Sequence, residues 1–263
     1  MQALYPDLKG RTALVTGASS GIGFGIAEAL LQQGMRVVLQ YKTHAPEARS
    51  LAARFGAAGG AGPAGFPFRA SLSTEQGCMD LAKYARDSLG KVDLFVHSAG
   101  IWNQGPIETL SAETLEEMFR VNTFSAFYLV RELIPALRPK GCVVLIGSTA
   151  GERGEARYSH YAASKGALQS MMMSLAVELA PQVRVNLVSP GWVRTQMAEQ
   201  ALQRIGPTMI PTLPNKRVAE VDDIVNAVLY LASDASGHVL GQTLSVSGGA
   251  LLVVPRGQLK AAE

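Results

Sequence analysis

The stretch Thr16-Gly17-Ala18-Ser19-Ser20-Gly21-Ile22-Gly23 joins a short apolar run to an amphipathic segment. Pyrophosphate binding requires a closely approaching backbone, free amide groups and a helix N-terminus that carries partial positive charge. Glycines at positions 17, 21 and 23 supply the tight turn, the close approach and the close helix packing. Such a loop alone is weak evidence, but here it lies in the first strand–helix unit, where a dinucleotide site is expected. The stretch therefore predicts a dinucleotide-binding fold.

Short apolar runs alternate with longer helical patterns on both sides of this loop. The predicted strands cover residues 12–16, 37–40, 66–70, 92–97, 143–146, 183–188 and 243–246. The predicted helices cover residues 22–33, 46–55, 74–89, 111–137 with Ser111 as N-cap, 158–180 and 221–231. Strands that are apolar throughout indicate burial on both faces. The alternation predicts an α/β fold with a single doubly wound (Rossmann) parallel sheet and helices on both faces.

Length and composition are typical of one packed domain. The chain has 263 residues, of which 48% are hydrophobic and 17% charged, so a large core is expected and a disordered chain is excluded. No stretch resembles an interdomain linker, so we expect a single domain over residues 1–263, with its core at 9–254 and short loose ends. The Gly-, Ala- and Pro-rich residues 56–65 predict a flexible surface loop.

The charge and cysteine patterns exclude several classes of partner. Lys and Arg number 24 against 21 Asp and Glu, and the excess is spread along the chain, so no nucleic-acid partner is expected. No apolar run reaches bilayer-spanning length, and residues 1–10 lack the pattern of a signal peptide. Cys78 and Cys142 show no metal-ligand spacing, and the histidines are scattered, so no metal site is expected. We expect a soluble, cytoplasmic protein without a membrane partner.

Tyr161 and Lys165 are four residues apart at the start of a predicted helix. They share a helix face, so the phenol and the ammonium group can meet. A free tyrosine has a pKa of about 10, and a cation at about 4 Å contributes roughly 4 kcal/mol, or about three pKa units. A Tyr/Lys pair at this spacing, taken alone, usually lies on an ordinary helix surface and has no functional role. Ser148 changes the interpretation, because it follows strand 143–146 at the carboxyl edge of the sheet, where its hydroxyl can bind a carbonyl oxygen.

Together these motifs resemble the compact form of the short-chain dehydrogenase/reductase family over nearly the whole chain. The matching residues are Thr16 to Gly23, Ala99-Gly100, Asn122, Ser148, Tyr161, Lys165, Pro190-Gly191 and Thr195. The resemblance implies that Tyr161 donates or accepts the proton and that Ser148 orients the carbonyl. It also implies that Lys165 lowers the pKa of Tyr161 and binds the nicotinamide ribose, and that Asn122 holds a water linked to Lys165. The expected activity is an NAD(P)-dependent interconversion of a ketone and a secondary alcohol.

The loop glycines and the resemblance also imply a set of cofactor-binding residues. These are Gly17, Ser19, Ser20, Gly21, Ile22, Gly23, Tyr41, Lys42, Ser71, Leu72, Ser98, Ala99, Gly100, Tyr161, Lys165, Pro190, Gly191, Val193 and Thr195. Three departures from the family pattern concern cofactor affinity and local packing: His97-Ser98 replaces Asn-Asn, Ser71 replaces an adenine-contacting Asp, and Ser247 replaces a late Asp. His97 is interpreted as a structural residue at a strand end.

The cofactor prediction depends on the end of the second strand. NAD-using relatives carry an acidic residue there, which binds both ribose hydroxyls and repels a 2′-phosphate. Tyr41 occupies that position, and Lys42 and Thr43 follow as donors to a phosphate. The alternative is that Lys42 points to solvent, and Ser20 is neutral where many NADP-using relatives carry a cation. The sequence therefore predicts NADP(H) as the preferred cofactor and leaves NAD(H) open.

Parts of the sequence are compatible with two other functions, and two helices indicate a quaternary structure. Residues 218–249 are similar to 3-oxoacyl-acyl-carrier-protein reductases, but Tyr128 stands where those enzymes carry an arginine. A non-catalytic NADP-binding sensor or scaffold would typically lose Tyr161 or Lys165, and both are present. Apolar residues in excess of one core-facing stripe on helices 111–137 and 158–180 predict a homotetramer, with a dimer as the alternative.

Three further segments lie near the predicted site. Trp102 and Trp192 follow strands and either line a substrate cleft or close the core. The charged residues between Ser148 and Tyr161 face either a polar substrate or, as the simpler interpretation, solvent. Residues 195–214 resemble the mobile segment that closes over substrate in the family, and their composition fits a partly apolar lid.

Overall fold

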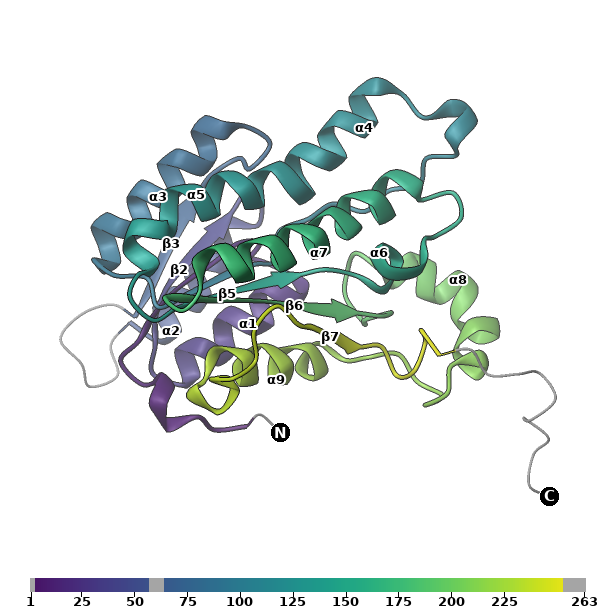
Figure 1. Ribbon diagram of the computed structural model, residues 1–263. Helices are drawn as coiled ribbons and strands as arrows, with labels where there is room; N and C mark the ends of the chain where they lie inside the picture. Colours follow the sequence, from purple (N-terminus) through teal and green to yellow (C-terminus); the bar gives the residue numbers. More distant parts are fainter. Residues whose placement is uncertain (1–2, 57–63, 253–263) are drawn as a thin grey trace, which may run out of the picture.

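The computed structural model describes residues 3–56 and 64–252, which form a seven-stranded sheet between two layers of helices (Figure 1). All strand pairs are parallel, in the order β3-β2-β1-β4-β5-β6-β7. The strands are β1 (Thr12–Val15), β2 (Arg36–Tyr41), β3 (Gly65–Arg69), β4 (Leu94–His97), β5 (Gly141–Ile146), β6 (Val183–Pro190) and β7 (Thr243–Val246). The principal helices are α1 (Gly21–Gln32), α2 (Ala45–Arg54), α3 (Glu75–Leu89), α4 (Ala112–Phe119), α5 (Ser125–Leu137), α6 (Thr149–Arg153), α7 (Ser159–Leu179), α8 (Glu199–Met209) and α9 (Val221–Ala232).

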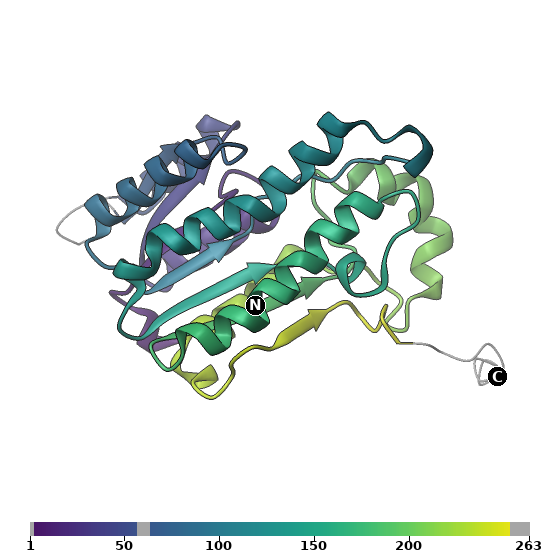
Figure 2. The same ribbon diagram turned by 45° about the horizontal axis from the view of Figure 1, so that its top comes forward.

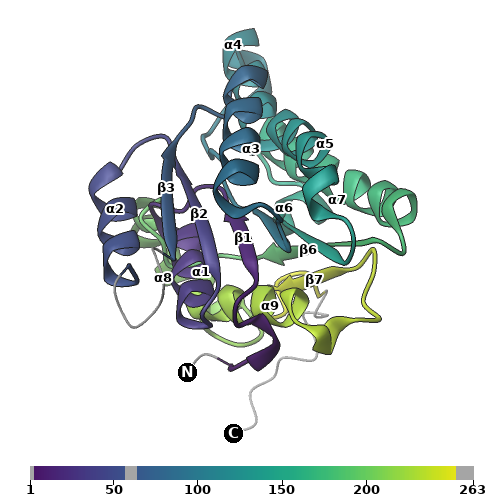
Figure 3. The ribbon, with the colours of Figure 1, turned by 90° about the vertical axis from the view of Figure 1, so that its left-hand side faces the viewer.

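Successive strand residues supply two hydrophobic cores, one on each face of the sheet. Ala13 and Val15 of β1 belong to the core beneath α1, α2 and α9, whereas Leu14 belongs to the core beneath α3, α5 and α7. Figure 3 shows these two helix layers from the end of the sheet. This arrangement confirms the predicted doubly wound parallel sheet, because apolar side chains on both faces of a strand need helices on both sides.

The predicted helix over residues 111–137 is wrong in one respect. Ser111 caps it as expected, because its Oγ accepts the N–H of Thr114. However, α4 and α5 are separated by a π-helical turn, η3 (Arg120–Phe124). A π-helical turn inserts an extra residue into the helix and changes the direction of the side chains that follow. Asn122 lies in this turn.

Two helices were not predicted, and both lie where the strands end. Figures 1 and 2 show α6 and α8 beyond the arrowheads of the strands, at the carboxyl edge of the sheet. The segment interpreted as a lid contains α8, with Pro207 inside it. Most of the predicted loop at residues 56–65 lies outside the described residues, and Gly65 begins β3. None of the helices in the described ranges is long and apolar enough to cross a membrane.

Candidate active site

The loop after β1 forms a cradle that only glycine can line. Gly17 and Gly21 have φ angles of +67° and +53°, in the region that favours glycine. A Cβ on Gly23 would lie 2.3 Å from the carbonyl oxygen of Gly17. Ser20 is the N-cap of α1, yet its hydroxyl caps no amide. The cradle therefore presents backbone close to a helix N-terminus, as a bound pyrophosphate requires.

Neighbouring strands hold this cradle in place. Thr16 Oγ1 accepts the N–H groups of Ser98 and Ala99, both at 3.0 Å, and so joins the ends of β1 and β4. Gln40 Oε1 accepts the N–H of Gly17 at 2.8 Å, and its Nε2 donates to the carbonyl of Ala70 at 2.9 Å. The buried Gln40 side chain thus fixes the ends of three adjacent strands, a role that the sequence analysis missed.

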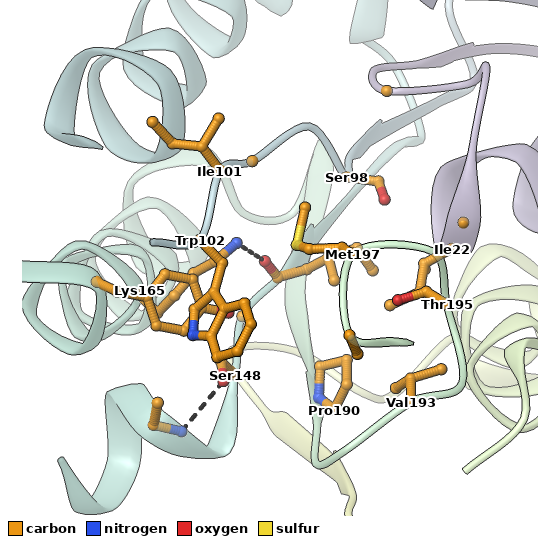
Figure 4. A pocket seen from close by; sticks show the side chains of 18 of the residues that line it. Ile22, Ser98, Ile101, Trp102, Ser148, Lys165, Pro190, Val193, Thr195 and Met197 are labelled. Atoms are coloured by element: carbon orange, nitrogen blue, oxygen red, sulfur yellow. Dashed lines mark hydrogen bonds between the residues drawn. The ribbon is translucent and has the colours of Figure 1, made fainter. Parts of the chain in front are cut away.

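Ser148, Tyr161 and Lys165 line one cavity of about 420 Å³ together with the glycine loop (Figure 4). Ser148 follows β5 and begins α6, and its Oγ accepts the N–H of Ala150 at 3.1 Å. Lys165 is only 5% exposed, and its Nζ donates to the carbonyl of Ile146 at 2.9 Å. The structure therefore brings together the predicted hydroxyl, phenol and ammonium groups from one connection, the segment with α6 and α7 that joins β5 to β6.

Asn122 lies behind this group and does not line the cavity. Its Oδ1 accepts the N–H of Ile101 at 2.8 Å, and its Nδ2 donates to the Ile101 carbonyl at 3.0 Å and to Ser164 Oγ at 3.1 Å. A Cβ on Gly100 would lie 3.2 Å from Asn122 Oδ1 and 3.4 Å from Lys165 Nζ. Asn122 is therefore close to Lys165 and fixes the loop that follows β4. The water expected between Asn122 and Lys165 stays a prediction.

The electrostatics of the chain differ from the expected pattern. Burial raises the pKa of Tyr161; an interaction with Ser148 opposes this, and the negative charge of Glu155 adds to it. Burial lowers the pKa of Lys165 to about 8. In the chain alone the net shift of the Tyr161 pKa is thus upward, opposite to the expected depression, because burial of the phenol is its largest cause. At neutral pH the phenol keeps its proton, which suits a proton donor.

Most of the predicted cofactor-binding residues line the cavity. These are Gly17, Ser20, Gly21, Ile22, Gly23, Ser98, Ala99, Gly100, Tyr161, Lys165, Pro190, Gly191, Val193 and Thr195. The predicted residues outside the lining are Ser19, Tyr41, Lys42, Ser71 and Leu72. Tyr41 and Leu72 are buried. The glycine cradle at the start of α1 fits the phosphates of a dinucleotide.

Two histidines differ in their relation to this site. His44 lines the cavity, and its Nδ1 lies 2.9 Å from Thr43 Oγ1. His97 is buried at the end of β4, where its Nε2 lies 2.8 Å from Ser125 Oγ. Burial, together with the nearby Lys165 charge, lowers the pKa of His97 to about 3. His97 is therefore neutral at physiological pH, in agreement with its interpretation as a structural residue.

Comparisons with known proteins agree with this geometry. A family model described as Enoyl-(Acyl carrier protein) reductase matches residues 17–250. Nodulation protein G of Rhizobium sp. (strain N33) is 34% identical over 94% of this chain and 99% of its own length. The 3-oxoacyl-acyl-carrier-protein reductase FabG of Escherichia coli (strain K12) is 32% identical over 94% of this chain and 100% of its own length.

Solved structures give the same result. A short-chain dehydrogenase/reductase from Brucella melitensis, with the description glucose/ribitol dehydrogenase, superposes with a TM-score of 0.88 and 31% identity. The match covers 94% of this chain and 98% of that one. The fold thus corresponds over almost the whole length of both chains.

Proposed function

We propose that this chain, which belongs to the short-chain dehydrogenase/reductase family and is therefore an NAD(P)-dependent oxidoreductase, reduces a ketone to a secondary alcohol. One observation carries the proposal: Ser148, Tyr161 and Lys165 line the same cavity as the glycine loop. A sensor or scaffold that binds nucleotide needs the loop but has no use for a buried ammonium beside a phenol. Burial of a charge is costly, and the hydrogen bond from Lys165 to the Ile146 carbonyl does not neutralise the charge, so this buried lysine points to function.

Each side chain has a distinct task in this reaction. The bound nicotinamide dinucleotide supplies the hydride. Ser148 accepts a backbone N–H, which leaves its hydroxyl proton for the carbonyl oxygen of the substrate. Tyr161, which keeps its proton at neutral pH, donates it to the same oxygen as negative charge develops there. The Lys165 ammonium stabilises the phenolate that results and binds the nicotinamide ribose.

The function is tested with a panel of ketones, acetoacetyl thioesters, sugars and steroids, with NADPH or NADH oxidation followed by absorbance. Turnover of at least one ketone supports the proposal. A chain that binds the nucleotide and reduces none of the carbonyls is a sensor or scaffold, and the proposal is then wrong. The same panel identifies the preferred class of substrate.

We propose NADP(H) as the preferred cofactor. Residues 40–46 contain no carboxylate that would repel a 2′-phosphate. Lys42 is exposed after β2, and Arg69 at the end of β3 donates to the Lys42 carbonyl at 3.3 Å. His44 lines the same cavity as Ser20 and Gly21. Lys42 and Arg69 place two positive charges at the carboxyl ends of β2 and β3.

The expected preference is several-fold in kcat/KM for NADPH over NADH, because an exposed ion pair contributes at most about 1 kcal/mol. Lys42→Ala should reduce the ratio, while Lys83→Ala, on the exposed side of α3 and outside the cavity, should leave it unchanged. The measurement is steady-state kinetics with both nucleotides. A parent enzyme that favours NADH contradicts the assignment, and an unchanged ratio in Lys42→Ala contradicts the role of Lys42.

A second candidate, reduction of 3-oxoacyl groups on an acyl carrier protein, is favoured by the similarity to FabG proteins. An acidic carrier needs unpaired cations near the site. On α4, η3 and α5, however, Arg120 is paired with Glu116 at 2.8 Å and Arg131 with Glu75 at 2.7 Å. Tyr128 lies beneath the Arg131 guanidinium instead of supplying a further arginine. We therefore place this function second, and the thioesters in the panel test it.

We also propose that the chain forms a homotetramer through η3, α5 and α7. Large apolar side chains on these elements are exposed: Phe124 by 42%, Phe127 by 47%, Met173 by 51% and Val177 by 81%. A continuous apolar face of this kind is typical of a subunit interface. Light scattering at micromolar concentration should give the mass of four chains, and Val177→Glu should lower it. A monomeric parent protein would rule out the assembly.

A further inference from the structure

The two tryptophans of the chain meet at one part of the candidate active site. Trp102 and Trp192, the complete set in the sequence, both line the cavity. Their ring centroids are 5.8 Å apart and their planes are at 89°. Figure 4 shows the Trp102 indole among the side chains of Ser148, Lys165 and Met197. The two rings form a right-angled aromatic corner beside the groups assigned to the proton transfer.

The Trp102 side of the corner is held rigidly. Its indole stacks on Tyr158, with centroids 4.9 Å apart and planes at 4°. The loop that carries Trp102 is fixed to the start of α7, because His160 Nε2 lies 3.0 Å from Asn103 Oδ1 and Gly105 donates to the Arg157 carbonyl at 2.9 Å. A ring that is already ordered loses little conformational entropy when a ligand binds.

The Trp192 side is anchored independently, in the segment that contains α8. Its carbonyl accepts the N–H of Ala219 at 2.8 Å. Its ring packs against a small core cluster formed by Leu202, Leu213 and Val218. The corner therefore joins two separate parts of the chain across the cavity, and its right angle does not depend on one flexible loop.

Apart from Lys165, which is assigned to the phenolate and the ribose, the charged side chains of the cavity lining are one arginine and one glutamate. Arg153 and Glu155 both line the cavity and carry opposite charges. Burial raises the pKa of Glu155, and the nearby Arg153 opposes that rise. The two charges therefore offset each other. Neither charge weakens the binding of an uncharged ligand, whereas an anion is repelled by Glu155 and a cation by Arg153.

We infer that the aromatic corner selects ketones with an aromatic ring on or next to the carbonyl carbon, an inference that rests on the proposed reductase function. Two perpendicular indoles offer a ring face and a ring edge, the two surfaces that a third aromatic ring prefers to contact. The carbonyl of such a ketone then lies toward Ser148 and Tyr161. A saturated ring of similar size has the same apolar area but lacks the aromatic contacts, so the aryl ketone should be favoured at least about tenfold.

The kinetic test compares acetophenone with cyclohexyl methyl ketone, using NADPH and kcat/KM as the readout. The parent enzyme should favour acetophenone at least about tenfold, Trp102→Leu should remove most of the preference, and Trp102→Phe should restore part of it. Tyr84→Leu, which removes a stacked ring from α3 outside the cavity, should leave the preference unchanged. Equal efficiency with both ketones, or an undiminished preference in Trp102→Leu, overturns the inference.

A binding test separates this inference from the proposed function. Because both tryptophans lie in the corner, indole emission in the Tyr161→Phe variant reports on that corner alone. Titration with 1-phenylethanol should change the emission at a concentration at least about tenfold lower than titration with 1-cyclohexylethanol. Equal affinities overturn the inference. Selective binding without turnover of any ketone by the parent enzyme supports the inference and refutes the reductase function.

Discussion

Tyr161→Phe should lower kcat for ketone reduction by at least about two orders of magnitude, the usual contribution of a general acid. The substitution keeps the ring and its packing but removes the proton that the carbonyl oxygen receives. The nucleotide contacts proposed for the glycine loop are untouched, so the affinity for NADPH should stay close to that of the parent. The measurements are steady-state rates and a nucleotide titration on the same preparation.

Tyr84→Phe is the matched control for this change. Tyr84 lies on α3, stacks on Phe68 and is outside the cavity, so loss of its hydroxyl should leave the rate unchanged. A Tyr161→Phe enzyme with a near-normal rate would show that another group donates the proton. Loss of activity together with loss of nucleotide binding would indicate a damaged site, and the mechanism would then lack its central support.

The sequence predicts the fold and the grouping of Ser148, Tyr161 and Lys165 in one cavity, because both depend on local patterns. Apolar strand runs and the glycine loop define the parallel sheet and the place of the cradle. Ser148 and the start of the helix with Tyr161 and Lys165 both lie in the connection that leaves the carboxyl end of β5, so the topology brings them to one edge of the sheet.

Other features escape prediction because they depend on packing between distant segments. The π-helical turn at Asn122 leaves the apolar pattern of the segment continuous, so periodicity does not reveal it. Pro207 and the preceding Gly206 argue against a helix, yet α8 forms because Leu202 packs in the cluster near Trp192. Gln40 did leave a signal, a polar residue in an otherwise apolar strand, and such a residue needs buried partners.

The sign of a pKa shift also depends on burial that the sequence does not specify. The spacing of Tyr161 and Lys165 suggested attraction between a phenolate and a cation. In the folded chain both groups are desolvated, and desolvation disfavours the charged form of each. The phenol therefore keeps its proton and the ammonium loses its proton more easily. This difference changes the expected consequence of removing Lys165.

Lys165→Met should abolish most of the activity. It should nevertheless stabilise the folded chain relative to the unfolded chain at neutral pH. Met has a similar length and is apolar, so it fills the same space without a charge. The variant loses the ammonium that stabilises the developing phenolate and contacts the ribose. Both kcat and the affinity for the nucleotide should therefore fall, in contrast to Tyr161→Phe, where the affinity is kept. Rates and nucleotide titrations distinguish the two variants.

The stability effect has a defined dependence on pH. The pKa of Lys165 falls from 10.5 to about 8 on burial in the folded chain. Below pH 8 the lysine is charged in both states, and its burial costs about 3 kcal/mol relative to the unfolded chain. Between about pH 8 and pH 10.5 the unfolded chain binds more protons than the folded chain, so the stability of the parent rises with pH through this site.

The methionine variant has no titrating group at this position. The difference in free energy of unfolding between the parent and the variant therefore isolates the contribution of Lys165. Between pH 8 and pH 10.5 the free energy of unfolding of the parent should rise by up to about 3 kcal/mol relative to that of Lys165→Met. The lost hydrogen bond to Ile146 changes the difference between the two proteins by the same amount at every pH and does not affect this rise. The measurement is urea unfolding of both proteins at several pH values. A difference that stays constant with pH would show that Lys165 is not desolvated in the folded chain. The ammonium would then be hydrated, and the argument that a costly buried charge marks this site as functional would fail.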